Sequence, residues 1–397
     1  MIDLERAFRE RAGIRATHVV RAPGRVNLIG EHTDYNDGHV LPMAIDRWVG
    51  LAGAPRQDGR IVLHAMHRDE RHESSLDNLA PVVGSGRHAH WSDYMLGVAH
   101  VLQQAGYRIG GFEAVVWGNV PRGSGLSSSA AVEVATATLL ASMFDLKLDP
   151  RVRARLAQRA ECDYVGVQCG IMDQFASSAG VAGHAIWLDC RSLESRALPL
   201  PLAAHEAEVW VIDSGVRRGL VDSEFNRRRQ ECQQAVKALG LALDRVDLAS
   251  LRDVSPEDLN RVGTTLEPTL LKRARHVVGE IARVEQALRC LEAGDLGAFG
   301  TLMNESHRSL RDDYAVSIAE LDYLVGSMQD TPGVFGARLT GAGFGGCCVA
   351  IARREARDEV ENTILPAYRM KFDRSPTLWA CQAVGGAEIL VPELLTP

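Results

Sequence analysis

The stretch Asn119–Ala135, which reads NVPRGSGLSSSAAVEVA, places the strongest constraint on the fold. Before it, alternating apolar residues in GFEAVVWGNV predict a β-strand. After it, apolar residues at helical spacing from Ala130 to Phe144 predict an α-helix. Gly123 and Gly125 let the backbone turn sharply and approach an anion closely. This order is typical of a phosphate-binding site, and equally of an ordinary turn with a helix cap.

Three serines at the predicted helix start favour the phosphate interpretation. Ser127, Ser128 and Ser129 would present free backbone N–H groups where the helix dipole is positive. Their hydroxyls add hydrogen-bond donors and a candidate Mg²⁺ ligand. The lysines stand in none of the Gly-Lys-Ser/Thr settings of a Walker loop, so that class of nucleotide site is excluded; they are Lys147, Lys237, Lys272 and Lys371.

A polar cluster follows a predicted strand near the N-terminus. Glu31, His32, Asp34, Asn36 and Asp37 come directly after the apolar residues of VNLIG. Burying such a cluster is costly unless its members are paired or bind a ligand. A solvated turn is one interpretation, and a metal site on the histidine and the first aspartate is another. We favour a polyol site, because carboxylates and imidazole together recognise several sugar hydroxyls.

Later segments add candidate residues with weaker local signals. Asp149–Pro150 predicts the start of a helix through about residue 165, which contains Glu161. Asp173 follows in CGIMDQF, where a lone aspartate is more often a helix cap than a catalyst. Helices are also predicted from Asp222 to Gly240, at about 267–293 and at 295–311, with a polar segment at 244–265. The glycine-rich stretch GARLTGAGFGGCCVAIA predicts a hairpin that closes on the same ligand as the first loop.

Composition excludes several classes of partner. The formal net charge of −7 and the isoelectric point of about 6.0 argue against nucleic acid or an anionic membrane surface. No stretch has the roughly 18 consecutive apolar residues of a membrane span, and no signal-peptide pattern opens the chain. Eight cysteines without a CxxC pair indicate free thiols. We therefore expect a cytoplasmic protein without membrane contact, either a monomer or a weak homo-oligomer.

Taken together, these motifs resemble the galactokinases of the GHMP family of small-molecule kinases. GRVNLIGEHTDYN resembles the galactokinase sugar signature, and GSGLSSSAAVEVA resembles the family's ATP loop. CGIMDQF, RARHVVGEI, ESHRSLRDDY and LTGAGFGGC extend the resemblance nearly from end to end. It implies that ATP and α-D-galactose give α-D-galactose 1-phosphate and ADP. The implied partners are thus a small-molecule sugar and ATP, with Mg²⁺ as the metal.

The resemblance also assigns roles to individual residues. Asp173 matches the catalytic base, and Arg25 matches the arginine beside the reacting hydroxyl. The positions matching the sugar site are Glu31, His32, Thr33, Asp34, Gly170 and Phe225. The positions matching the ATP loop are Gly123, Ser124, Gly125, Leu126, Ser127, Ser128 and Ser129. Ser129 and Glu161 match the Mg²⁺ ligands, and Trp91 is a candidate for either the adenine pocket or the core.

The fold implied by the resemblance is a mixed α/β (α+β) two-domain kinase with its site between the halves. The N-terminal domain, 1–190, is expected to contain a left-handed β-α-β unit. The C-terminal domain, 191–397, is expected to be a ferredoxin-like α+β domain. The shift in composition by itself places the boundary within 180–205.

Two residues depart from the galactokinase pattern. Phe225 stands where galactokinases usually carry a sugar-contacting tyrosine, and the missing hydroxyl removes a hydrogen bond of about 1 kcal/mol. Ala342 stands where glycine is commoner. Phe225 keeps open a related sugar 1-kinase acting on N-acetylgalactosamine, L-arabinose or galacturonate. A non-catalytic galactose sensor is the third hypothesis, and the presence of both Arg25 and Asp173 argues against it.

Overall fold

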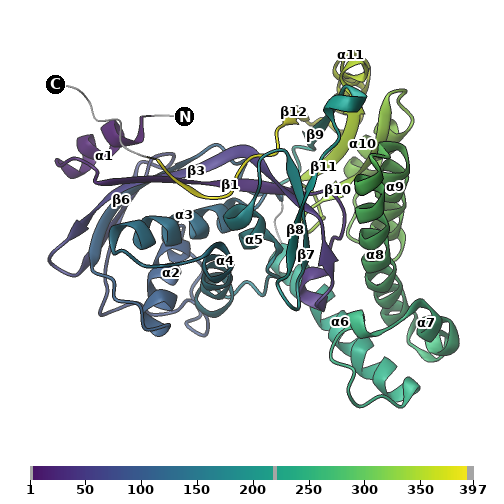
Figure 1. The fold of residues 1–397 in the computed structure, drawn as a ribbon, viewed down its shortest axis with the longest axis horizontal. Coiled ribbons are helices and arrows are strands. Elements are labelled where there is room, and N and C mark those ends of the chain that lie inside the picture. The colour runs from purple at the N-terminus through teal and green to yellow at the C-terminus, as the bar shows by residue number, and fades with distance from the viewer. Residues whose placement is uncertain (1–2, 218–220, 391–397) are drawn as a thin grey trace.

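The computed structural model describes residues 3–217 and 221–390, without the side chains of 221–223, and mixes helices with three β-sheets. Figure 1 shows two parts joined side by side. The larger sheet has six strands in the order β13 (Glu388–Leu390), β1 (His18–Asn27), β3 (Pro42–Arg56), β6 (Gly111–Gly118), β4 (Arg60–Ala65) and β5 (Glu70–Ser75). The predicted strand before the glycine loop is β6.

Helices cover this sheet mainly on one face (Figure 1). They are α2 (Asp93–Gln104), α3 (Ser128–Met143), α4 (Pro150–Arg159) and α5 (Met172–Ala179), whereas α1 (Leu4–Ala12) lies on the opposite face. The helix after the glycine loop, α3, packs on β1 and β3. Because Ala130, Ala131, Val134 and Ala135 are all buried, this small-residue face lets the helix lie close to the sheet.

The second part contains a four-stranded antiparallel sheet. Its strands follow the order β10 (Val334–Thr340), β11 (Cys347–Arg353), β9 (Ala207–Asp213) and β12 (Thr377–Cys381). The predicted glycine hairpin is the β10–β11 pair. Helices α8 (Pro268–Ala293), α9 (Leu296–Asp312) and α10 (Ala319–Gln329) stand beside this sheet (Figure 1). The remaining elements are β2 (His39–Val40), β7 (His184–Asp189), β8 (Ser195–Pro199), α6 (Val221–Leu243), α7 (Pro256–Val262), α11 (Arg357–Glu359) and α12 (Leu365–Phe372).

The two parts share strands and core. β13, from the end of the described chain, pairs antiparallel with β1 through Val19 and Leu390. The largest buried cluster contains Val134 from the first part together with Phe299 and Val349 from the second. Among the described strands the parallel pair is β4–β6. The left-handed crossover and the boundary at 190 stay predictions.

A bulge in β1 sets up the site. The register of β1 against β3 shifts between Pro23 and Arg25, and a Cβ added to Gly24 would lie 2.7 Å from the carbonyl oxygen of Leu126. Glycine therefore lets β1 touch the loop before α3, and the N–H of Arg25 donates to that same carbonyl at 3.1 Å. Bulges of this kind re-aim side chains next to functional sites.

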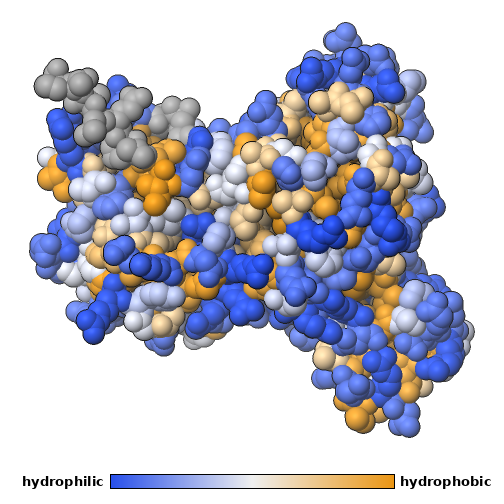
Figure 2. Space-filling model, in the orientation of Figure 1, coloured by the Kyte–Doolittle hydropathy of each residue, from blue (hydrophilic) through white to orange (hydrophobic). Residues whose placement is uncertain are grey.

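The surface and the helices agree with the composition. Figure 2 shows hydrophilic residues spread over the viewed face, with smaller hydrophobic areas between them. Within the described ranges, every helix is too short or too polar to cross a bilayer.

Candidate active site

A cavity of about 570 Å³ collects most of the predicted site residues. Its wall includes the glycine–serine loop and the polar cluster after β1, which are far apart in the sequence. The predicted residues that line it are Arg25, Glu31, His32, Asp34, Gly123, Gly125, Ser127, Ser128, Ser129, Glu161, Gly170, Asp173 and Phe225. Gly341 and Ala342 of the β10–β11 loop also line it, so both glycine-rich loops border one cavity.

Arg25 and Asp173 meet in this cavity although 148 positions separate them. The Arg25 Nε donates to Asp173 Oδ1 at 2.8 Å, and its Nη2 lies 2.5 Å from the same oxygen. The hydroxyl of Ser127 donates to Asp173 Oδ2 at 2.5 Å. Arg25 Nη1 also donates to the carbonyl of Gly125 at 2.5 Å. The carboxylate of Asp173 is therefore held in a fixed orientation while 28% of its side chain stays exposed to the cavity.

The start of α3 is built to receive an anion. Ser127 lies in the left-handed region (φ 63°) and provides no side-chain cap, since its hydroxyl is engaged with Asp173. The first intrahelical bond runs from the N–H of Ala131 to the carbonyl of Ser127. The N–H groups of residues 128–130 thus have no intrahelical acceptor. Together with the helix dipole, they create positive potential facing the cavity.

Two predicted loop residues turn their side chains away from the cavity. The hydroxyl of Ser124 is buried and donates to the carbonyl of Pro121 at 2.7 Å. Leu126 is 1% exposed and belongs to the main core. Their side chains therefore shape the loop, and neither residue lines the cavity.

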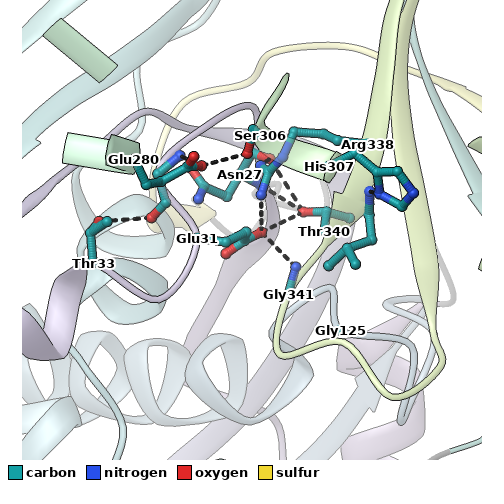
Figure 3. A network of polar contacts seen from close by, with 12 residues as sticks. Asn27, Glu31, Thr33, Gly125, Glu280, Ser306, His307, Arg338, Thr340 and Gly341 are labelled. Atoms are coloured by element: carbon teal, nitrogen blue, oxygen red, sulfur yellow. Dashed lines mark hydrogen bonds and ion pairs between the residues drawn. The ribbon is translucent and has the colours of Figure 1, made fainter. Parts of the chain in front are cut away.

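Glu31 is fixed by the second part of the molecule (Figure 3). Its Oε1 accepts hydrogen bonds from the N–H of Gly341 at 2.6 Å and from the hydroxyl of Thr340 at 3.2 Å, and lies 3.6 Å from Arg338 Nη2. The N–H of Gly30 donates to Glu280 Oε1 at 3.0 Å. The loop after β1 is thus held in place by α8 and β10.

His32 and Asp34 project from the same turn. His32 is buried in the left-handed region (φ 63°), and burial, followed by the nearby His276 and Arg228, holds its pKa well below the usual range. Burial, and then the Asp173 and Glu31 carboxylates, raise the pKa of Asp34 to about 7. A buried imidazole that is neutral beside carboxylates offers both donors and acceptors to hydroxyl groups.

Gly170 allows Asp34 to occupy its position. A Cβ at residue 170 would lie 1.9 Å from Asp34 Oδ2, so any other side chain would displace this carboxylate. Thr33, by contrast, directs its hydroxyl into the turn, 2.8 Å from the carbonyl of Gly30 and 2.7 Å from that of His39. Thr33 therefore supports the turn and does not line the cavity.

Comparisons with known proteins identify the family. The galactokinase galactose-binding signature matches residues 6–55, and the GHMP kinase N-terminal and C-terminal domains match residues 93–181 and 287–368. A galactokinase of Roseiflexus sp. (strain RS-1) is 46% identical over 384 residues, which is 97% of this chain and 96% of that protein. The chain belongs to the galactokinase family. It is accordingly an ATP-dependent sugar kinase.

Solved structures show the same relationship. A Lactococcus lactis galactokinase in complex with galactose superimposes with a TM-score of 0.91 at 35% identity, covering 97% of this chain and 98% of the other. A mevalonate kinase of Methanococcus jannaschii gives a TM-score of 0.65 at 18% identity, over 94% and 100% of the two chains. This second likeness concerns the fold alone.

The two departures from the galactokinase pattern both lie at the cavity. The Phe225 ring is 5.9 Å from the His32 ring and 5.2 Å from the Tyr35 ring, tilted to the first and edge-on to the second, and it lines the cavity. Among the described residues with positive φ, the β10–β11 loop includes Gly341, Gly343 and Phe344 but not Ala342. An alanine at 342 therefore introduces no backbone strain.

Ser129 and Glu161 fit a Mg²⁺ site. Glu161 lies in a π-helical segment (Ala160–Val165), where the helix predicted through residue 165 widens, and the hydroxyl of Ser129 donates to it. Burial, and then Asp173, raise the pKa of Glu161 to about 7, and its hydrogen-bond neighbours Ser129, Cys169 and Gln174 carry no positive charge. A buried carboxylate beside a hydroxyl supplies the oxygen ligands Mg²⁺ prefers, and phosphate oxygens and water would supply the rest.

A second cavity of about 520 Å³ adjoins the first. Tyr94, Ser128 and Ser129 line both, so the two meet at the start of α3. Trp91 lines this second cavity, with its indole N–H donating to Glu70 at 2.6 Å. Trp91 therefore stands beside the space that continues from the phosphate loop.

Several residues of the galactokinase site were not singled out from the sequence. Arg338 is fully buried beside Glu31, and an arginine inside the apolar strand GARLT was the available signal. Arg217 pairs with Asp213, and its Cδ would be 3.7 Å from a Cβ at Gly123, beside the phosphate loop. The contact of Arg338 with Glu31 and the approach of Arg217 to Gly123 join distant segments, so sequence spacing does not predict these two contacts.

Proposed function

We propose that this chain transfers the γ-phosphate of ATP to the anomeric hydroxyl of α-D-galactose, giving α-D-galactose 1-phosphate and ADP. The observation that carries the proposal is the position of Asp173 between Arg25 and Ser127, inside a cavity bordered by both the sugar-side turn and the phosphate loop. The Roseiflexus sp. protein and the Lactococcus lactis structure are both galactokinases, which supports galactose as the sugar.

The residues divide the chemistry between them. Asp173 accepts the proton of the anomeric hydroxyl, which is more acidic than an ordinary alcohol. Arg25 keeps Asp173 oriented, and its fixed positive charge stabilises the charge that develops on the transferred group. Glu31, His32 and Asp34 bind the other sugar hydroxyls, and the N–H groups at the start of α3 bind the phosphates.

Mg²⁺, held by Ser129 and Glu161, would neutralise charge on the phosphate oxygens. Positioning and electrostatics then supply most of the rate, as in other phosphoryl transfers. ATP use together with eight free thiols fits the cytoplasm, where thiols stay reduced.

The position of transfer is tested with two sugars. With galactose, ADP release should require both the protein and Mg²⁺. With methyl α-D-galactopyranoside, whose anomeric oxygen is blocked, ADP release should stay at background. ADP release with the methyl glycoside would show transfer to another hydroxyl and overturn the proposed position. Phosphorus NMR of the galactose product identifies the phosphorylated carbon independently.

Phe225 favours a second candidate, a 1-kinase for a related sugar. The Phe225 ring lines the cavity and lacks the hydroxyl of the usual tyrosine. A substituent of the sugar that reaches this ring would therefore meet an apolar surface. Ranking galactose, N-acetylgalactosamine, L-arabinose and galacturonate by kcat/KM decides between the two. A higher kcat/KM for any of the last three would replace galactose as the substrate.

A further inference from the structure

Two cysteines approach one another in the wall of the proposed site. Cys162 lies in the π-helical segment after α4, and Cys169 lies in the loop before α5. Their Sγ atoms are 3.8 Å apart, and the Cys162 thiol also lies 3.6 Å from the carbonyl oxygen of Cys169. Both are free cysteines of intermediate burial. A disulfide needs about 2.05 Å between the sulfur atoms, so a shift of less than 2 Å would suffice.

The loop that contains Cys169 touches both halves of the site. The Cys169 thiol lines the cavity and donates to Glu161 Oε2 at 3.5 Å. The next residue, Gly170, packs so tightly against Asp34 that a Cβ there would overlap the carboxylate. A covalent pull on Cys169 toward Cys162 would therefore remove a hydrogen bond from Glu161 and move the backbone that packs on Asp34.

We propose that Cys162 and Cys169 form a reversible disulfide, with a low-molecular-weight disulfide as the oxidant, and that this bond suppresses the sugar-kinase activity. The kinetic part of the proposal rests on the function proposed above, whereas formation of the bond does not. The disulfide would make the activity depend on thiol redox conditions. The two cysteines would act by displacing their neighbours and not by touching the reacting atoms.

The exchange balances in two steps. The Cys162 sulfur attacks one sulfur of the reagent, and the reagent's S–S bond breaks to release one small thiol. The Cys169 sulfur then attacks the Cys162 sulfur of the mixed disulfide and releases the second small thiol. The two protein thiols together lose two electrons and two protons. The electrons and the protons end on the two small thiols that the reagent releases.

The bond is tested with 2-hydroxyethyl disulfide on the full chain. Chymotrypsin cleaves after Tyr164 and Phe175 and so separates the two cysteines. The oxidised protein should yield these two peptides as one linked species, with two fewer titratable thiols, and dithiothreitol should separate them. Unlinked peptides after treatment would overturn the proposal.

The effect on activity is tested in parallel with matched variants. Oxidation should lower galactose-dependent ADP release about tenfold or more, since a displacement of about 1 Å in a site is costly, and dithiothreitol should restore it. C162S should resist this loss, whereas C290S, which removes a partly exposed thiol on α8, should be inactivated like the wild type. A linked protein with undiminished turnover, or equal inactivation of C162S, would overturn the coupling.

The failure of each proposal can be recognised separately. If the reduced wild type releases no ADP with galactose, the proposed function is wrong. The linked peptides and the thiol count still show whether the disulfide forms. If C162S does not fold, the wild-type peptide map and its reversal by dithiothreitol remain decisive.

Discussion

Acidification should weaken galactose binding through Asp34. Burial, and then the neighbouring carboxylates Asp173 and Glu31, raise the pKa of Asp34 to about 7. A sugar hydroxyl that donates to this carboxylate requires its ionised form. With a pKa of about 7, the ionised fraction is about 0.9 at pH 8 and about 0.1 at pH 6. Because the apparent Kd varies inversely with the competent fraction, it should rise about tenfold over this range.

The assay is calorimetric titration of galactose at pH 6, 7 and 8, without nucleotide or Mg²⁺. Leaving these out matters because the pKa of Glu161 is also raised to about 7 and would add its own pH dependence to ATP binding. The control is Asp34→Asn, which should bind galactose weakly with a Kd that is nearly flat from pH 6 to 8. A wild-type Kd that does not change between pH 6 and 8, or a slope that survives in Asp34→Asn, would refute the reasoning.

Three further substitutions test separate parts of the site. Gly170→Ala should raise the Kd for galactose about tenfold or more by displacing Asp34, and calorimetry at pH 8 with a thermal melt as control measures it. Glu161→Gln should raise the Mg²⁺ concentration needed for half-maximal rate by about tenfold or more while the galactose Kd stays near wild type; an unchanged Mg²⁺ titration would contradict the assignment. Phe225→Tyr should lower the KM for galactose about fivefold at similar kcat, because one hydrogen bond contributes about 1 kcal/mol, and an unchanged KM would place the ring away from the sugar.

Strong local patterns predicted much of the fold. The helix expected at 267–293 is α8 (Pro268–Ala293), because long amphipathic periodicity and a proline at the first turn are local signals. The glycine–serine loop and the polar turn at 31–34 were also predicted from the sequence. In both, polar residues that are costly to bury stand where a predicted strand ends. The helix α7 (Pro256–Val262), inside a segment expected to be merely polar, is too short for periodicity to show, although Ser255 and Asp258 form its capping box.

Long-range contacts set the limit of prediction. That Arg25 and Asp173 belong together followed from the family resemblance, because no spacing rule relates residues 148 positions apart. The return of β13 to β1 brings together segments from opposite ends of the described chain. The π-helical turn at Glu161 and the inward orientation of the Thr33 hydroxyl likewise follow none of the sequence patterns described above. These features are stabilised by contacts in the folded protein. They therefore give no periodic pattern of residues in the sequence.

The most direct test of the account is the turnover of Asp173→Asn with galactose and Mg²⁺-ATP. Asparagine keeps the shape and can still bond with Arg25 and Ser127, so the galactose Kd should change by no more than about threefold. Loss of the proton acceptor should lower kcat by about a hundredfold or more. A variant that folds, binds galactose and retains most of the wild-type kcat would contradict the central claim that Asp173 takes the proton from the sugar.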